Sequence, residues 1–397
     1  MEIRLFSFQG IRNGISYGVV KGFLPIIDKL DEKLNNRLIY YLGSNNGYEG
    51  SIHLIGLNNG YVFLIRLISL VNRMFFKLPS YKLRYINERL FDVFAARKIN
   101  NPCIIISTAY LSKTLLKNKA LGGTNIFFAG NPDDFDINII LKKEQKVNNV
   151  VFKDAYTYEK RLKFISKSIF LFDHIITLTI SQFESYRKRV NKEKVSFVEY
   201  HIIPNSKAFP FLVLPKGKEL SFCFVAHPFW LKGLPNLLDA WSKINQQGIK
   251  LRIAGTINQY LQKVIDEKFS SLENVEYLGW VEDLNMFYRT SSVCIVPSLL
   301  DAGPATVAEA MFCGLPVIVS DGCGARTLVE DGISGFVTSS GNSIELSDKI
   351  NWFISNQDRI EIMGKEATKR IVELAKSNQN DIVANHILNM IIELQKL

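Results

Sequence analysis

The sequence has few cysteines, and none is spaced as a disulfide or metal pair. Its 397 residues contain five cysteines, an odd number with no CxxC pair, and most lie inside apolar runs. This excludes a disulfide framework and predicts buried thiols in a reducing compartment. The cysteines are Cys103, Cys223, Cys294, Cys313 and Cys323.

Long uncharged apolar runs are also missing. The longest apolar stretch, residues 61–78, is interrupted by Arg66, Arg73 and Lys77, so it is too polar to cross a bilayer. The first residues, MEIRLFSFQGIRNG, lack the basic, apolar and small-residue order of a signal peptide. We therefore expect a cytoplasmic protein that can lie at the inner face of the membrane.

The sequence lacks fixed-period repeats, low-complexity tracts, zinc-finger spacing and a long basic arm. The formal net charge is +10, but Lys and Arg are interleaved with apolar residues, most densely over 60–100 and 140–195. This pattern disfavours nucleic acid and favours an anionic ligand together with a membrane surface. Residues 64–85 mix apolar side chains with five basic ones, which suits an amphipathic segment in peripheral contact with an anionic bilayer. The alternative is a helix half buried in an N-terminal core.

The residues that are abundant predict two folded domains of the α/β class. The chain is 47% hydrophobic, and it exceeds the roughly 250–300 residues at which a single core stops growing. Short apolar runs alternate with stretches long enough for helices, which implies parallel sheets covered on both faces. The expected strands are residues 3–8, 38–42, 103–107, 125–128 and 174–178, then 222–225, 250–254, 293–296, 317–319 and 335–337.

A stretch rich in proline, residues 203–218, reads as a connection between the two domains. We expect a Rossmann-like N-terminal domain over 1–205, a linker over 206–218 and a Rossmann-like C-terminal domain over 219–380. A last helix over 381–397 has no assigned packing partner. Because ligands of doubly wound sheets lie beyond the carboxyl ends of the strands, the cleft between two such domains is the expected site.

Residues 296–320, VPSLLDAGPATVAEAMFCGLPVIVS, read as strand, loop, helix, turn and strand. Gly303 permits close backbone approach, and the proline after it fits a first helical turn, where a missing N–H costs nothing. The next three backbone amides and the helix dipole predict an anion site suited to a diphosphate. These amides belong to Ala305, Thr306 and Val307.

Two carboxylates flank this helix start. Asp301 lies just ahead of the helix and Glu309 about one turn inside it. A carboxylate can accept two hydroxyl protons at once, which suits a ribose diol or sugar hydroxyls. Taken singly, each residue could instead be a solvated aspartate or a helix-stabilising glutamate.

The whole segment resembles the donor-binding signature of the retaining glycosyltransferase family 4, which has the GT-B architecture of two Rossmann-like domains facing across a cleft. Asp301 and Glu309, with seven residues between them, stand in the places of the family's two acidic residues, although Asp301 replaces the family's Glu. The resemblance implies that Asp301 contacts the sugar and Glu309 the ribose. It also implies a nucleoside-diphosphate sugar as co-substrate, without a metal or other cofactor.

Further matches to the family extend over residues 220–340. In residues 224–233, FVAHPFWLKG, Lys232 would pair with the diphosphate, and His227 stands where many relatives have an arginine. Four residues lie where the resemblance places contacts to the base: Gly255, Thr256, Trp280 and Val281.

The N-terminal half matches less of the family pattern. Gly10 and Gly14 resemble a glycine-rich loop that in relatives lies against the diphosphate and the acceptor. The family's histidine after a middle strand is absent from residues 126–132, where Asn131 stands in a related place. Asp134 and Asp136 form a DxD, which binds a divalent ion in another class of glycosyltransferase and is kept as a rival interpretation.

The resemblance implies transfer of a sugar, with retention, to an acceptor hydroxyl in cell-surface glycan or glycoconjugate biosynthesis. The acceptor, a carbohydrate or lipid-linked glycan, would bind the N-terminal domain, and the sugar nucleotide the C-terminal domain. The catalytic candidates are Lys232, Asp301 and Glu309. One alternative is a catalytically silent relative that binds a partner or a nucleotide. A Rossmann oxidoreductase is disfavoured because no GxGxxG follows the first expected strand.

Overall fold

The computed structural model describes residues 2–7, 11–12, 15–16, 19–35, 38–42, 53–57, 59–204, 219–226, 230–244 and 246–395. The chain divides into two compact units. The first comprises Met1–Phe135, Lys153–Tyr200 and Asn378–Leu397, and the second Asp136–Phe152 and His201–Ser377. This division differs from the expected one because residues 136–152 group with the second unit and the last helix with the first. The expected linker, 206–218, lies outside the described residues.

The first unit contains a seven-stranded sheet in the order β5-β4-β1-β6-β7-β8-β9, with every neighbouring pair parallel. Its strands are β1 (Glu2–Ser7), β4 (Leu38–Leu42), β5 (His53–Gly56), β6 (Cys103–Ser107), β7 (Thr124–Phe128), β8 (His174–Thr177) and β9 (Val195–Phe197). A separate antiparallel pair joins β2 (Ile11–Arg12) and β3 (Ile15–Ser16).

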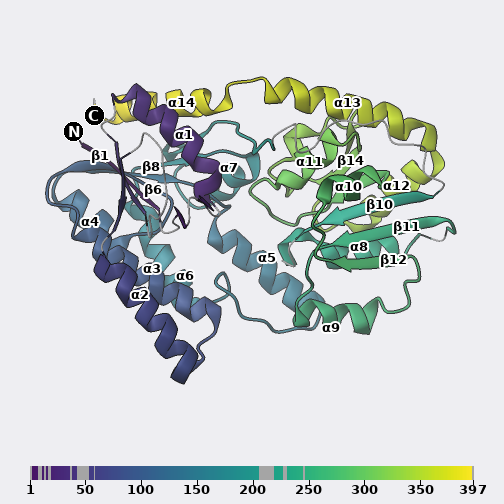
Figure 1. Ribbon diagram of the computed structural model, residues 1–397, viewed down its shortest axis with the longest axis horizontal. Coiled ribbons are helices and arrows are strands. Elements are labelled where there is room, and N and C mark those ends of the chain that lie inside the picture. The colour runs from purple at the N-terminus through teal and green to yellow at the C-terminus, as the bar shows by residue number, and fades with distance from the viewer. Residues whose placement is uncertain are drawn as a thin grey trace. The chain divides into compact units, whose positions relative to one another are not determined.

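Helices cover both faces of this sheet (Figure 1). They are α1 (Val19–Lys33), α2 (Asn59–Val71), α3 (Ser80–Ala96), α4 (Ser112–Ala120), α6 (Glu159–Ser168) and α7 (Ile180–Arg187), with a π-helical turn η1 (Asn72–Phe76) between α2 and α3 and short 3₁₀ turns η2 (Ile169–Leu171) and η3 (Lys192–Lys194). Alternate residues of β6 enter opposite cores, because successive side chains of a strand point to opposite faces. Ile104 and Ile106 pack with α1, whereas Cys103 and Ile105 pack with α3.

The last helix of the chain, α14 (Gln379–Leu394), completes the core of the first unit. Its apolar side chains are buried beside those of α1, and Figure 1 shows the two helices side by side. An ion pair of 2.9 Å between Lys33 and Asp381 joins them at one end. The packing partner that the sequence left unassigned is therefore α1. The buried residues of α14 are Val383, Ala384, Ile387, Met390 and Ile391.

The second unit contains a six-stranded parallel sheet in the order β12-β11-β10-β13-β14-β15. Its strands are β10 (Leu220–Val225), β11 (Ile249–Ala254), β12 (Val275–Gly279), β13 (Val293–Val296), β14 (Val317–Ser320) and β15 (Gly335–Thr338). Its helices are α8 (Leu234–Trp241), α9 (Gln259–Lys268), α10 (Leu284–Arg289), α11 (Ala305–Phe312), α12 (Ser343–Ser355) and α13 (Gln357–Ala375), with 3₁₀ turns η4 (Trp230–Lys232) and η5 (Arg326–Leu328). Helix α5 (Asp134–Val147) begins in the first unit and continues into the second.

All ten expected strands are present, each within two residues of its predicted ends. The prediction of buried thiols is also confirmed: all five cysteines are free and buried. Burial raises the pKa of Cys103 to about 11 and that of Cys313 to about 12, so these thiols stay protonated at neutral pH. Among the described residues, no helix combines the length and the apolar character needed to cross a membrane.

Candidate functional site

The amino end of α11 is held in the core and carries hydrogen-bond donors that have no partner among the described residues. Val307 and Met311 are fully buried in the core of the second unit and hold the helix against its sheet. The Val307 amide, which the sequence suggested was unpaired, donates a long hydrogen bond of 3.4 Å to the Pro304 carbonyl. The amides of Ala305 and Thr306 have no acceptor among the described residues, and the buried Thr306 hydroxyl has no partner there either. These groups and the positive end of the helix suit an anion.

Lys232 and Asp301 form an ion pair between Nζ and Oδ2. The other carboxylate oxygen of Asp301 accepts a hydrogen bond of 2.9 Å from the Gly303 amide. The backbone of Asp301 is fixed as well, since its amide donates to the Gly322 carbonyl and its carbonyl accepts from the Gly324 amide. Asp301 therefore holds the Lys232 ammonium against the loop that opens α11.

The loop that carries Lys232 is fixed by close backbone contact. Lys232 ends η4, and the Leu299 amide donates to the Leu231 carbonyl at 2.7 Å. The next residue, Gly233, has a φ of 75°, and a Cβ there would lie 2.0 Å from the Pro297 carbonyl oxygen. Only glycine fits this position. The loop can therefore pack against Pro297, which follows β13, only because glycine comes directly after Lys232.

An aromatic contact from the 136–152 segment supports the same loop. The rings of Phe152 and Trp230 stack with centroids 5.2 Å apart and an interplanar angle of 7°. Trp230 is buried and lies two residues before Lys232. Phe152 therefore stabilises the turn that positions Lys232. It can do so because residues 136–152 belong to the second unit.

Glu309 is held by a residue that the sequence did not single out. The Tyr288 hydroxyl, on α10, donates to Oε2 of Glu309 at 3.0 Å. Burial, followed by the negative charge of Glu309, raises the pKa of Tyr288 well above its usual value, so the hydroxyl remains a donor at neutral pH. Tyr288 was missed because its partner lies 21 residues away in the sequence.

The four residues expected near the base have different surroundings. Gly255 follows β11 with a φ of 132°, and a Cβ there would lie 1.8 Å from the Ala226 carbonyl oxygen, which fits close backbone packing. Thr256 and Trp280 are exposed, and Val281 is partly buried against the core of the second unit. Three other candidates, Gly10, Gly14 and His227, lie outside the described residues.

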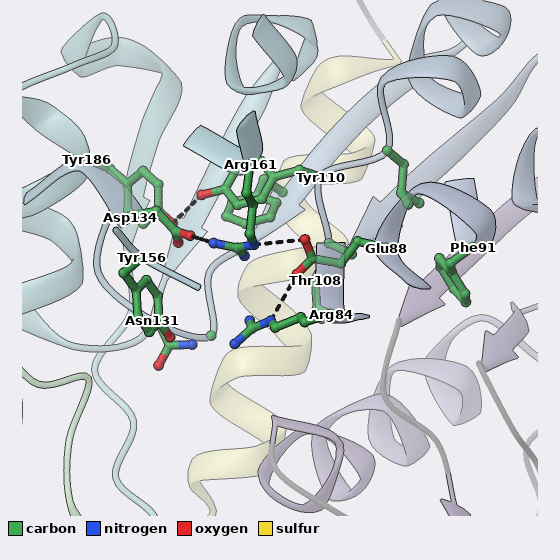
Figure 2. Close-up of a pocket in the computed structure, with 14 residues that line it drawn as sticks. Arg84, Glu88, Phe91, Thr108, Tyr110, Asn131, Asp134, Tyr156, Arg161 and Tyr186 are labelled. Atoms are coloured by element: carbon green, nitrogen blue, oxygen red, sulfur yellow. Dashed lines mark hydrogen bonds and ion pairs between the residues drawn. The ribbon is translucent and has the colours of Figure 1, made fainter. Parts of the chain in front are cut away.

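A second site lies wholly within the first unit. A pocket of about 90 Å³ opens beyond the carboxyl ends of β6 and β7 (Figure 2), the edge at which parallel sheets bind ligands. This volume accommodates a few water-sized groups, which is enough for part of a sugar ring. Asn131, which the sequence placed near the reacting sugar, lines the pocket. The other polar or aromatic lining residues are Arg84, Glu88, Thr108, Tyr110, Asp134, Tyr156, Arg161 and Tyr186.

Ion pairs organise one wall of this pocket, as the dashed lines in Figure 2 show. Arg161 is buried, its Nε lies 2.8 Å from Glu88, and it forms a second ion pair with Asp134. Burial alone would lower the pKa of Arg161, but the charges of Asp134 and Glu88 raise it overall. Arg84 contacts the other oxygen of Glu88 at 3.0 Å, while much of its side chain is exposed. The first carboxylate of the DxD is thus neutralised by an arginine.

Hydroxyl groups line the pocket beside this network. The Tyr110 and Tyr186 hydroxyls lie 3.2 Å apart. Burial raises the pKa of both tyrosines well above the usual value, so both stay protonated. The pocket therefore combines neutral hydroxyls, aromatic faces and the exposed part of Arg84, which can together bind a polyhydroxylated ligand. No local pattern marked Tyr110 and Tyr186, because these two residues are 76 positions apart in the sequence.

Comparison with known proteins gives a family match and sequence relatives. Residues 206–370 match the family model of the glycosyl transferases group 1. An uncharacterized glycosyltransferase of Haemophilus influenzae is 30% identical over 200 residues, which are 47% of this chain and 53%, about half, of that protein. The N,N'-diacetylbacillosaminyl-diphospho-undecaprenol alpha-1,3-N-acetylgalactosaminyltransferase of Campylobacter jejuni is 22% identical over 70% of this chain and 80% of its own length.

Solved structures share the fold over the full length. Anabaena Alr3699/HepE in complex with UDP has a TM-score of 0.59 and 15% identity, covering 100% of both chains. The lipopolysaccharide outer core galactosyltransferase WaaB has a TM-score of 0.65 and 14% identity, covering 98% of this chain and 100% of its own. These likenesses confirm the predicted architecture. Residues 206–370 therefore match the glycosyl transferases group 1, and the two parallel-sheet units have the GT-B fold.

Proposed function

We propose that this protein is a retaining glycosyltransferase that moves a sugar from a nucleoside-diphosphate sugar to an acceptor hydroxyl in glycan or glycoconjugate biosynthesis. The observation that carries the proposal is the amino end of α11. Two backbone amides and a buried hydroxyl lack partners among the described residues, and the Lys232 ammonium is held at the adjoining loop.

In this proposal the second unit binds the donor. The amides of Ala305 and Thr306 and the ammonium of Lys232 bind the diphosphate, and Glu309 binds the ribose hydroxyls. Asp301 orients Lys232. Because a carboxylate has about four acceptor positions, Asp301 can also accept a hydroxyl of the donor sugar without releasing Lys232 or the Gly303 amide.

The proposed step is a substitution on one face of the sugar. The bond between the anomeric carbon and the diphosphate oxygen breaks, and its electron pair leaves with the diphosphate. The acceptor oxygen bonds to the anomeric carbon from the same face and gives its proton to the departing phosphate oxygen. Lys232 and the helix end stabilise the charge that develops on the leaving group, so the positive charge comes from the chain itself.

We assign the acceptor to the pocket beyond β6 and β7. Its hydroxyls, aromatic rings and Arg84 suit a sugar, and a cationic side chain also suits a phosphate next to that sugar. The name of the Campylobacter jejuni relative describes an acceptor carried on diphospho-undecaprenol. This supports a lipid-linked glycan as the acceptor class here.

Donor binding is tested with a thermal-shift panel of UDP-, GDP-, ADP- and dTDP-sugars. One donor class is expected to raise the melting temperature, since a ligand at 100 times its dissociation constant stabilises by about 2.7 kcal/mol. UDP-sugars come first because a protein of the same fold was solved with UDP. Glu309→Ala should abolish the shift. Binding without any donor hydrolysis or transfer would instead indicate a catalytically silent protein.

The acceptor assignment needs a variant that leaves the donor site intact. Arg84→Gln should keep the donor-induced thermal shift and the slow hydrolysis of the donor, yet reduce transfer to a diphospho-undecaprenol-linked sugar at least tenfold, which corresponds to about 1.4 kcal/mol. Arg89→Gln is the matched control, because Arg89 is on the same helix and does not line the pocket. Equal transfer by both variants would contradict the assignment.

A further inference from the structure

The helix α2 carries a row of apolar side chains that the described residues leave exposed. Phe63, Leu67 and Leu70 recur at the spacing of one helical face, and Met74 in η1 extends the row. All four are exposed, Phe63 to 64% and Met74 to 60%. Only the beginning of α2 is anchored in the core, where the buried Tyr61 meets the rings of Phe91 and Phe94.

The turn between α2 and α3 adds two more exposed aromatic side chains. Phe75 is 71% exposed and Phe76 67%, and no residue of η1 is buried. The turn is nevertheless well fixed, because Oδ1 of Asn72 accepts from the Leu78 amide at 2.7 Å and the Asn72 carbonyl accepts from the Lys77 amide at 2.7 Å. In Figure 1 this end of α2 lies away from the strands of the first sheet. The fold thus holds apolar rings in solvent at a structured tip.

The charged side chains that the chain itself carries from α2 to the middle of α3 are of one sign. Residues 51–87 contain no Asp or Glu. Arg66, Arg73 and Lys77 are exposed beside the apolar row and form no ion pair with any described residue. An apolar row flanked by unpaired basic side chains complements a surface that is apolar inside and anionic outside.

We propose that the hairpin formed by α2, η1 and α3 docks on an anionic lipid bilayer. Phe63, Leu67, Leu70, Met74, Phe75 and Phe76 insert among the lipid chains, while the basic side chains contact the headgroups. The same helix α3 that begins at this tip carries Arg84 and Glu88 into the pocket. With a rise of 1.5 Å per residue, Ser80 and Glu88 lie about 12 Å apart along α3.

Docking of the hairpin adds to the proposed transfer to a lipid-linked acceptor, and its consequence for the acceptor rests on that proposed function. Docking of the tip holds the acceptor pocket about 12 Å along α3 from the docked end of the hairpin. An acceptor sugar attached to a lipid can then reach the pocket while its lipid anchor stays in the bilayer. The pocket would therefore select lipid-anchored over water-soluble acceptors.

The test is flotation of the full-length protein with vesicles, in the absence of donor and acceptor. We expect binding to equimolar phosphatidylglycerol and phosphatidylcholine, and at least tenfold weaker binding to phosphatidylcholine alone. Arg66→Gln/Arg73→Gln/Lys77→Gln should weaken binding about 100-fold, since each basic side chain contributes about fivefold. Phe75→Ser/Phe76→Ser should weaken it at least tenfold. Raising the salt concentration should weaken binding further.

Matched variants in the second unit control for net charge and for exposed apolar side chains. Lys365→Gln/Lys369→Gln/Lys376→Gln removes the same charge, and Ile344→Ser/Ile362→Ser removes exposed apolar groups; both should bind vesicles as the parent protein does. Equal binding by tip and control variants would overturn the proposal. So would a dimer in sedimentation that Phe75→Ser/Phe76→Ser converts to a monomer, without vesicle binding by the parent. None of these readouts requires transferase activity, so their failure would leave the proposed function standing.

Discussion

The buried hydroxyl of Tyr288 helps to position the carboxylate of Glu309. A hydrogen bond to a charged acceptor contributes about 1.5–3 kcal/mol, and removing the donor leaves the carboxylate less well oriented. Tyr288→Phe should therefore weaken binding of the donor about tenfold or more, measured by calorimetry with the sugar nucleotide found in the thermal-shift panel. Tyr277→Phe, a partly exposed tyrosine of the same unit, should have no effect. An unchanged dissociation constant for Tyr288→Phe would show that Glu309 does not depend on this contact.

The position of Lys232 depends on the absence of a side chain at the next residue, Gly233. In Gly233→Ala the new methyl would lie 2.0 Å from the Pro297 carbonyl oxygen, in a backbone conformation that alanine disfavours. We expect the loop to shift, transfer to fall at least 100-fold and the melting temperature to decrease. Gly248 has a similar φ of 77°, but no atom lies within 4 Å of a Cβ there. Gly248→Ala should thus cost only about 1 kcal/mol of stability and retain transfer, and similar activity losses in both variants would contradict the steric argument.

At the scale of an element, α14 belongs to the core of the first unit although it lies at the C-terminal end of the sequence. Ile387 is fully buried against α1, whereas Ile392 on the same helix is exposed. Ile387→Ala should lower the free energy of unfolding of the first unit by about 2–5 kcal/mol. Ile392→Ala should change it by less than about 0.5 kcal/mol. Denaturant unfolding followed by far-ultraviolet circular dichroism measures the free energy of unfolding of both variants. Equal small effects of the two substitutions would mean that α14 is not part of this core.

The contact between α14 and β9 predicts a dependence of stability on pH. Nε2 of His386 lies 2.9 Å from the Ser196 hydroxyl, and burial lowers the pKa of both His386 and the nearby His174, with the Glu393 carboxylate acting in the opposite direction. Because the folded-state pKa lies below the unfolded value of about 6.5, the unfolded state binds more protons as the pH falls. The stabilisation is therefore complete above pH 6.5 or so and is lost on acidification.

His386→Asn removes one of these two groups. The melting temperature of the parent protein should fall between pH 7.5 and pH 5.5, and the fall should be smaller in the variant. An equal or larger fall in His386→Asn would place the pH dependence elsewhere.

At the scale of the whole molecule, the positive charge proposed for the donor site comes from Lys232 and the amino end of α11. The first carboxylate of the DxD is paired with Arg161, which leaves it a poor ligand for a cation. We expect transfer to persist at full rate in excess EDTA and in the Asp136→Asn variant. Loss of transfer in EDTA, with recovery on addition of manganese, would restore the rival interpretation of a metal-dependent enzyme.

The strands, and the order of strand, loop, helix and strand in residues 296–320, could be predicted from the sequence because both are local patterns. Buried strands of a parallel sheet are nearly continuous apolar runs, as in residues 293–296, and the proline at 304 marks the helix start that follows. Long-range partners have no such pattern. Arg161 meets Glu88 from 73 residues away, and Tyr288 meets Glu309 from another helix. The periodicity of α14 showed that it had an apolar face but not that α1 would cover it.

Neither unit is an uninterrupted piece of the chain, and this has a consequence during protein synthesis. The core of the first unit includes side chains of α14, which follow the whole 201–377 stretch of the second unit. At roughly 5–20 residues per second, a ribosome needs roughly 10–35 seconds to add that stretch. Throughout this interval α1 packs on the sheet but lacks α14, the helix that covers its other apolar side chains. We therefore expect the N-terminal half of the nascent polypeptide to benefit from a chaperone until α14 has been synthesised.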